Sequence, residues 1–454
     1  MTESEFRLLI DAGISSHAHF RNRWESMEED DSLSVSGERS ASILSELGER
    51  LNDNYPFFHP RYAGQMIKPP HPIAMAAYMM AMQINPNNHA LDGGPATAKL
   101  ELEVVGQIAK MFGYTDHLGH LTSSGTFANL EALWVARSIH PDKAIAYSPS
   151  AHYTHRRMCE VINARSMELD VTDLELLETE LKKGSIGTLV VTIGTTGTGS
   201  VEPLHRILPL AKKYGVRIHA DCAYGGFFTL LAHAPEPIIA PEPFLVLHEC
   251  DSIVIDPHKH GLQPYGCGCV LFRDATVGKY YRHDSPYTYF TSKELHLGEI
   301  SLECSRAGAS AAALWATLKA FPLRADEGLG PILRKTRHAA VVWSELISSS
   351  RNLIEYCKPD LDIVIYFPKT PVLSASRISA ATERIFTTAM HRSESPLYLA
   401  AFAVPSSAMA KYSTDFVADI PVTKVLRSVL MKPEHEHFVT TIFREITAIS
   451  GSIL

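Results

Sequence analysis

The sequence predicts an α/β protein built on a mostly parallel sheet with helices on both faces. Four short runs are apolar throughout and are separated by helical stretches: "AIAY" (144–147), "TLVVTI" (188–193), "VRIHA" (216–220) and "SIVI" (252–255). A strand buried on both faces is a continuous apolar run, and alternation of such strands with helices is typical of parallel sheets. "GCVLFRD" (268–274) predicts one more strand.

The flanking segments have a different texture. Residues 1 to about 55 are polar and include helical patches such as "ASILSELGERLND" (41–53), which predict an N-terminal helical arm. Amphipathic or apolar stretches predict helices over 97–114, 127–139 and 204–214. After about residue 330 a long helix leads into a small α+β domain, whose last helix has Phe438, Ile442, Ile446 and Ile449 on one face. We therefore expect three parts, 1–75, 76–330 and 331–454.

Composition excludes several classes of function. The 454 residues are 45% hydrophobic and 20% charged, with a net charge of −8 and no basic block, which argues against nucleic acids and anionic membranes as partners. No run reaches 18 apolar residues, and the N-terminus does not read as a signal peptide. The seven cysteines are scattered and Cys267 and Cys269 lack a zinc-ligand spacing, so we expect reduced thiols, no metal site and a cytoplasmic protein.

In open α/β sheets, ligands bind at the carboxyl ends of the strands. "TSSGTF" (122–127) leads directly into a predicted helix. Hydroxyl groups and free backbone N–H groups at a helix N-terminus can bind an anion such as phosphate, although an ordinary helix cap has the same composition. Neither of the glycine-rich nucleotide motifs is present.

Four more strand ends carry polar side chains. His152 follows 144–147, Thr195 lies in a Gly-rich turn after 188–193, Asp221 ends 216–220, and Lys259 comes four residues after 252–255. Taken alone, each of these residues could be an ordinary helix cap, turn residue or surface residue. Together they supply an amine that can form a Schiff base, a carboxylate that can keep a pyridine nitrogen protonated, an imidazole that can stack on a flat ring, and a phosphate cradle. The ligand that needs all four is pyridoxal 5'-phosphate.

The order of these pieces resembles the group II pyridoxal-phosphate amino-acid decarboxylases, which include glutamate, cysteine-sulfinate, aspartate, aromatic-amino-acid and diaminobutyrate decarboxylases. "DPHKHGLQPYGCG" is similar to the lysine signature of that family, "HADCAYGGF" to its Asp-bearing strand, "TSSGTFANLEAL" to its phosphate loop, and "SAHYTHRR" to the segment with its ring-stacking His. The resemblance runs from about His59 to the C-terminus. It implies the pyridoxal-phosphate transferase type I (aspartate-aminotransferase-like) fold.

The resemblance also implies a role for each matching residue. Lys259 would bind the cofactor covalently, Asp221 would pair with the pyridine nitrogen, and His152 and Ala223 would pack on the two faces of the ring. Ser123, Ser124 and Thr126 would bind the phosphate, with His258 nearby, and Thr195 would make a hydrogen bond near Asp221. Ser305 of "LECSRAGASAAALW" would contact a phosphate across a dimer interface. Arg427 of "VLRSVLMKP" would bind the substrate carboxylate.

The implied activity is decarboxylation of an L-amino acid to its amine by a homodimer with active sites between subunits. "HPRYAGQM", with Gln65 as a substrate-binding residue, favours an acidic substrate. In "RHDSPYTYFTSKEL" (282–295), Tyr287 is the first candidate and Tyr289 the second for the proton donor to Cα. The family usually has a bulky apolar residue where this chain has His260. Three alternatives are oxidative deamination to an aldehyde, carbon–carbon lyase chemistry, and a homologue that binds a partner without catalysis.

Overall fold

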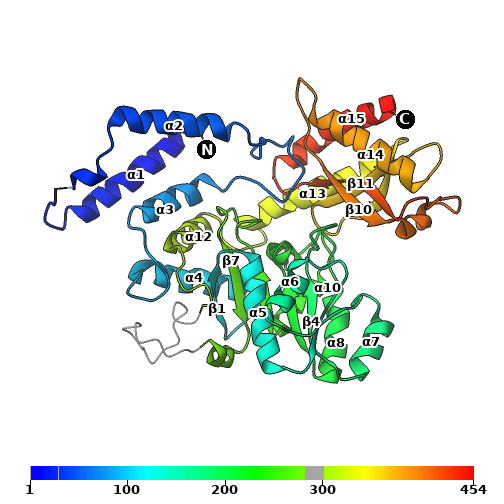
Figure 1. Cartoon of the computed structure of the whole chain (residues 1–454), viewed down its shortest axis with the longest axis horizontal. Coiled ribbons are helices and arrows are strands. Elements are labelled where there is room, and N and C mark those ends of the chain that lie inside the picture. The colour runs from blue at the N-terminus through cyan, green and yellow to red at the C-terminus, as the bar shows by residue number, and fades with distance from the viewer. Residues whose placement is uncertain (1, 29, 282–300, 454) are drawn as a thin grey trace.

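We describe the protein from a computed structural model, in which residues 2–28, 30–281 and 301–453 are described. Its central element is a seven-stranded sheet in the order β1-β7-β6-β5-β4-β2-β3 (Figure 1). The strands are β1 (Leu118–Thr122), β2 (Ala144–Tyr147), β3 (Ser166–Glu168), β4 (Ile186–Thr192), β5 (Arg217–Asp221), β6 (Ser252–Ile255) and β7 (Gly268–Phe272). Only β7 runs against its two neighbours. The predicted, mostly parallel sheet is therefore confirmed.

Helices cover both faces of this sheet because alternate side chains of each strand enter different cores. In β7, Val270 and Phe272 pack with Ala128 and Ala132 of α5 (Gly125–Ile139). Leu271 of the same strand joins a second core. That core also contains apolar residues of α4 (Pro95–Met111), α8 (Leu204–Tyr214) and α12 (Gly308–Ala320). Burial of the strands on both sides explains why they are apolar throughout.

The C-terminal part has its own antiparallel sheet in the order β10-β11-β9-β8. Its strands are β8 (Leu353–Cys357), β9 (Ile363–Pro368), β10 (Ala400–Pro405) and β11 (Val422–Val429). The helices α13 (Leu329–Ser348), α14 (Ala375–Met390) and α15 (His435–Ile453) share a core with it. Ile442, Ile446 and Ile449 of α15 are buried there and Phe438 packs against it, as the sequence predicts.

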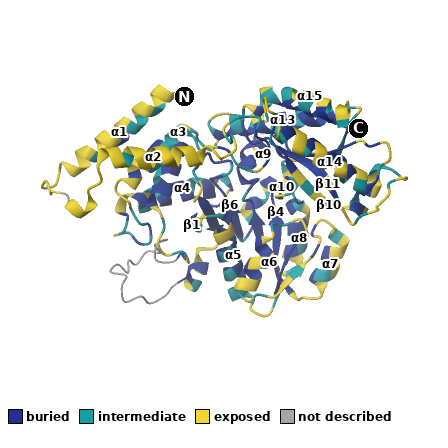
Figure 2. Ribbon diagram, turned by 45° about the horizontal axis from the view of Figure 1, so that its top comes forward, coloured by how far each residue is buried: buried dark blue, intermediate teal, exposed yellow. Residues whose placement is uncertain are grey.

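The N-terminal arm consists of α1 (Glu3–Arg21) and α2 (Gly37–Leu51), which extend away from the body of the molecule (Figure 1). None of the residues of α2 is buried, and both helices are largely exposed (Figure 2). The helix α3 (Pro72–Met82) returns the chain to the body and packs against α12. On this arrangement we propose the division 1–75, 76–330 and 331–454.

The remaining helices are short: α6 (Thr154–Val161), α7 (Leu174–Lys182), α9 (Thr229–Ala232) and α10 (Glu242–Leu245). None of the helices in the described ranges is long and apolar enough to cross a membrane. Strands β1, β2, β4, β5 and β6 point the same way, so their carboxyl ends meet at one edge. Of the predicted site residues, His152, Thr195, Asp221 and Lys259 lie at or just after these ends.

Candidate active site

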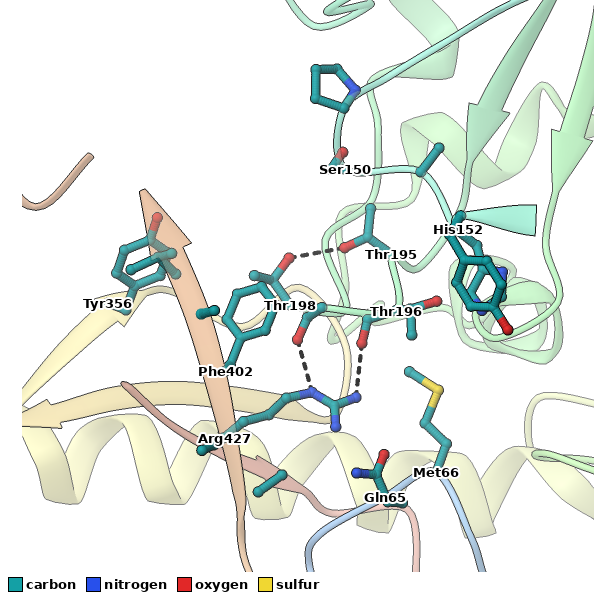
Figure 3. A pocket seen from close by; sticks show the side chains of 18 of the residues that line it. Gln65, Met66, Ser150, His152, Thr195, Thr196, Thr198, Tyr356, Phe402 and Arg427 are labelled. Carbon is teal, nitrogen blue, oxygen red and sulfur yellow. Dashed lines mark hydrogen bonds between the residues drawn. The ribbon is translucent and has the colours of Figure 1, made fainter. Parts of the chain in front are cut away.

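Two adjoining cavities lie at this edge of the sheet. The smaller has a volume of about 250 Å³ and is lined by Ser124, Gly125, Thr126, His152, Asp221, Ala223, His258 and Lys259 among others. The larger has a volume of about 930 Å³ and opens toward the C-terminal sheet (Figure 3). Lys259 and His152 line both. The smaller cavity thus brings together seven of the residues predicted to hold the cofactor or do the chemistry.

Lys259 leaves a tight turn after β6 and its side chain is about four-fifths buried, with 19% exposed. Its Nζ atom lies 3.0 Å from Oδ2 of Asp256, which directly follows the strand. Asp256 belongs to the quoted lysine signature, but sequence reasoning gave it no role. A buried amine beside one carboxylate is held at the junction of the two cavities.

The first turn of α5 forms an open cradle. Ser124 caps this helix, since its Oγ accepts the backbone N–H of Phe127 at 3.4 Å. Gly125 is packed so closely that an added Cβ would lie 2.6 Å from Oδ2 of Asp256. Thr126 is exposed beside it. Backbone N–H groups and hydroxyls at a helix N-terminus, next to a cavity wall without a side chain, fit a phosphate group.

Asp221 lies at the end of β5, buried, with two fixed donors. Oδ1 accepts the backbone N–H of Ala223 at 3.1 Å, and Oδ2 accepts Nε2–H of His155 at 2.8 Å. Burial alone would raise the pKa of Asp221, but the hydrogen bond and charge of His155, with the nearby Lys259, outweigh burial and lower that pKa. The carboxylate is therefore ionised, as a partner of a protonated ring nitrogen must be.

His152 begins the loop that leads into α6. Its Nδ1 accepts the backbone N–H of Thr154 at 3.3 Å, and burial lowers the pKa of the imidazole. A neutral ring whose orientation is set by the backbone is suited to stacking on a cationic ring.

His258 directly precedes Lys259 in the chain and lines the smaller cavity. Its Nδ1–H donates to the carbonyl of Cys267 at 2.7 Å, and burial lowers its pKa. The sequence assigns Cys267 no role; the structure shows that its backbone orients His258, while its thiol is buried. His260 is among the residues that line neither cavity; it is buried against the rings of Tyr224 and Phe228, with its Nε2 3.4 Å from Oδ2 of Asp362. This explains how an imidazole replaces a bulky apolar side chain.

Arg427 of β11 reaches the larger cavity from the second sheet. Its Nε, Nη2 and Nη1 donate to the carbonyls of Gly197, Thr196 and Gly64 at 2.9, 2.8 and 3.2 Å. Gln65 lies beside it (Figure 3). Three of the five guanidinium N–H groups are thus engaged, which fixes the side chain and leaves two for a ligand.

Three other predicted residues lie outside the smaller cavity. Thr195 lines the larger cavity, but its Oγ1 is hydrogen-bonded to Thr198 at 2.9 Å rather than to Asp221. Ser123 lines neither cavity, and its backbone N–H donates to Glu303 at 2.8 Å. Ser305 also lines neither cavity, and its hydroxyl accepts from Asn87 at 3.1 Å. Tyr287 and Tyr289 lie outside the described residues.

The donor set therefore fits pyridoxal phosphate. Lys259 can bind its aldehyde carbon, Asp221 its ring nitrogen, His152 one face of the ring, and the first turn of α5 its phosphate. Within 2–28, 30–281 and 301–453, no three His, Cys, Asp or Glu side chains gather in a way that could hold a metal ion.

Comparison with known proteins agrees with this assignment. Residues 137–366 match the family described as the pyridoxal-dependent decarboxylase conserved domain. The chain is 30% identical over 266 residues to a probable L-tyrosine/L-aspartate decarboxylase of Methanothermobacter thermautotrophicus, covering 57% of this chain and 70% of that protein. It is 26% identical to the L-tyrosine decarboxylase of Enterococcus faecium, covering 75% and 74%.

Among solved structures, Oryza sativa TDC with PLP and tryptamine superimposes with a TM-score of 0.76. It covers 99% of this chain and 98% of that one at 15% identity, which shows a common fold. The predicted type I fold is thereby confirmed. The family match over residues 137–366 agrees with the lysine and the carboxylate at the expected strand ends and with the cradle for phosphate. The chain therefore belongs to the pyridoxal-dependent decarboxylase family, the amino-acid carboxy-lyases that use pyridoxal 5'-phosphate.

Proposed function

We propose that this enzyme decarboxylates an L-amino acid with an acidic side chain, L-aspartate being the first candidate. The observation that supports an amino-acid substrate is the immobilised guanidinium of Arg427, which lines the larger cavity together with Lys259. A fixed guanidinium with two free N–H groups is a good partner for a carboxylate. The name of the Methanothermobacter thermautotrophicus relative includes both L-tyrosine and L-aspartate. The choice of aspartate is supported by a relative from Thermococcus kodakarensis, 30% identical over 292 residues, whose name is L-aspartate decarboxylase.

The proposed reaction uses residues of both cavities. When bound, pyridoxal phosphate supplies an aldehyde that condenses with the substrate amine and a ring that accepts the electron pair left as CO2 departs. Lys259 would hold the cofactor through its aldehyde carbon. Asp221 would keep a proton on the ring nitrogen, and His152 would fix the plane of the ring. A proton must then reach Cα, and Tyr287, with Tyr289 second, stays our candidate for its donor.

A second candidate substrate is L-tyrosine. The larger cavity is lined by aromatic side chains, including Tyr153, Tyr265, Tyr356 and Phe402, and an aromatic substrate would pack against them. The name of the Enterococcus faecium relative agrees with this choice. Both candidates carry an α-carboxylate, so Arg427 alone does not separate them.

A panel of the twenty amino acids, scored for CO2 and for hydrogen peroxide, tests the proposal. CO2 from aspartate without peroxide supports it. CO2 from tyrosine alone replaces it by the second candidate. Stoichiometric peroxide would mean oxidative deamination to an aldehyde, and CO2 from none would leave carbon–carbon lyase chemistry or a binding role.

We further propose that the enzyme is a homodimer that acts in the cytoplasm. Ser305 would reach the phosphate of the partner subunit, which agrees with its place outside both cavities of its own chain. Ile43, Leu44, Leu47 and Leu51 of α2 are 53%, 65%, 48% and 57% exposed. An apolar face of this size is unfavourable in water unless another subunit covers it.

All seven cysteines are free thiols, which supports a reducing compartment.

A further inference from the structure

One turn of α6 places a second histidine behind the proposed cofactor site. His155 follows His152 by three residues, and its backbone N–H donates to the carbonyl of His152 at 3.1 Å. Its imidazole points into the sheet, where Nε2 lies 2.8 Å from Oδ2 of Asp221. The side chain of His155 is fully buried and that of Asp221 is 5% exposed.

This contact has a defined direction. An ionised carboxylate can only accept, so Nε2 of His155 carries the hydrogen. Because Oδ1 of Asp221 is held by the N–H of Ala223 at 3.1 Å, each carboxylate oxygen has one fixed donor and the plane of the group is set. Both oxygens keep a further lone pair for a ligand. Without the imidazole, burial would favour the neutral carboxyl, which cannot hold a proton on a ring nitrogen.

Stability alone does not account for His155. Its other nitrogen, Nδ1, is buried and has no hydrogen-bond partner among the described residues. A half-satisfied buried imidazole costs free energy that an apolar side chain of similar size would avoid. Other buried imidazoles, such as His260, also have nitrogens without a hydrogen-bond partner within the described ranges; what distinguishes His155 is that its paired nitrogen contacts the carboxylate predicted to hold the cofactor ring.

His219 offers a natural comparison. It lies two residues before Asp221 on β5, with its ring centre 6.2 Å from that of His155. Its Nδ1 is bonded to Oγ of Ser252 at 2.9 Å and its Nε2 to Oδ1 of Asn129 at 2.7 Å. Burial lowers its pKa to about 3, so it is neutral. It is as buried as His155 but makes no hydrogen bond to Asp221.

We propose that His155 is a positioning residue: by donating Nε2–H to Asp221, it fixes that carboxylate in its ionised form and thereby keeps the proton on the pyridine nitrogen of the bound cofactor. This inference rests on the proposed role of Asp221. It adds a residue that does not touch the cofactor yet sets its protonation.

The test reads the ring nitrogen directly. Apo-enzyme is reconstituted with pyridoxal phosphate labelled with ¹⁵N in the ring, and the ¹⁵N chemical shift reports the ratio of protonated to unprotonated nitrogen at neutral pH. In His155→Phe this ratio should fall by about ten- to hundredfold, the usual effect of a hydrogen bond to a charged group. His155→Gln, whose amide N–H can reach Asp221, should restore most of it. His219→Phe should leave it unchanged.

The possible results separate the hypotheses. A wild-type ratio in His155→Phe, with a shifted ratio in Asp221→Asn, overturns the role of His155 alone. A wild-type ratio in Asp221→Asn overturns the assignment of Asp221 and with it the proposed site. An equal fall in His219→Phe would mean that lost packing is the cause, and would also overturn the role of His155.

If His155→Phe does not fold, His155→Gln and His155→Asn make the same comparison, because the Asn amide is too short to reach Asp221. The proposal is supported if His155→Gln keeps the wild-type ratio of protonated to unprotonated ring nitrogen and His155→Asn does not. It is overturned if both variants keep that ratio.

Discussion

The Nζ atom of Lys259 lies 3.0 Å from Oδ2 of Asp256, and both side chains leave the same turn after β6. The amine is thereby held at the junction of the two cavities, within reach of a ligand in either. Two other lysines, Lys68 and Lys432, are more deeply buried, and burial lowers their pKa to about 8 and about 7. Their amines donate to backbone carbonyls instead.

This contrast gives the first prediction. Borohydride reduction of the holoenzyme, followed by peptide mapping, should place the cofactor on Lys259 and on neither Lys68 nor Lys432, because of these three lysines only Lys259 lines the two cavities of the site. Lys259→Ala should lose the reducible link entirely. A label on one of the other two lysines would show that a low pKa, rather than position, selects the nucleophile.

The second prediction concerns the cradle. In Gly125→Ala the new Cβ would lie 2.6 Å from the Asp256 carboxylate, so we expect about 1–3 kcal/mol of destabilisation and weaker cofactor binding. Gly106→Ala is the matched control, because no atom lies within 4 Å of its added Cβ in α4. Ala should stabilise that helix by about 0.5–1 kcal/mol. Thermal unfolding measures the stability of each variant, and cofactor titration measures its affinity for pyridoxal phosphate. Equal cofactor affinity in the two variants would argue against a close contact between residue 125 and Asp256 in the cradle.

The third prediction is a pH dependence of stability. Burial raises the pKa of Glu202 from its ordinary 4.5 to about 7. Between these two values the folded state binds a proton that the unfolded state has lost, so this group makes the protein less stable as pH rises through that window, by at most about 3 kcal/mol. Glu202→Gln should remove this loss.

Urea unfolding of wild type and Glu202→Gln at several pH values across the window is the measurement. Only the difference between the two proteins is informative, because buried histidines such as His219, whose pKa is lowered to about 3, act in the opposite direction. A difference that does not change with pH would contradict the prediction.

The fourth prediction concerns Arg427. Arg427→Lys keeps the charge but cannot span the carbonyls of Gly64, Thr196 and Gly197 at once. We expect a lower melting temperature and a KM for the preferred substrate raised about tenfold or more, since hydrogen bonds to charged groups contribute about 1.5–3 kcal/mol. Steady-state kinetics and calorimetry test this. An unchanged KM together with a lower melting temperature would make Arg427 a structural residue only.

The fifth prediction concerns assembly. Leu47→Glu introduces a charge into the exposed apolar face of α2, and should shift the protein from dimer to monomer with loss of activity. Ser42→Glu, on the other side of the same exposed helix, should have no such effect. Light scattering with activity assays distinguishes them, and a dimer that survives Leu47→Glu would exclude this face from the interface.

Much of the fold can be predicted from the sequence because strands buried in a parallel sheet consist of consecutive apolar residues. Strand β1 was not among the strands expected from such runs, because "LGHLT" contains a glycine and a histidine; His120 is tolerated there because Glu131 lies 2.8 Å from its Nε2. Strand β3 has three residues, two of them exposed, and carries no pattern.

The site shows the same limit. Lys259, Asp221 and His152 follow strand ends, and that position makes them conspicuous. His155 and Asp256 do not stand out, because a histidine inside a short helix and an aspartate before a proline are both common. Only the packing of α6 against the end of β5 reveals that His155 meets Asp221.

The two cavities are built from different parts of the chain. The residues around the smaller one come from 124–259, whereas the larger is walled in addition by 65–67, Tyr356 and 400–405. Substrate choice and cofactor chemistry can therefore evolve on separate stretches of the gene. A mutant library confined to the second set should therefore change which amino acid is accepted more than it changes the residues proposed to hold the cofactor.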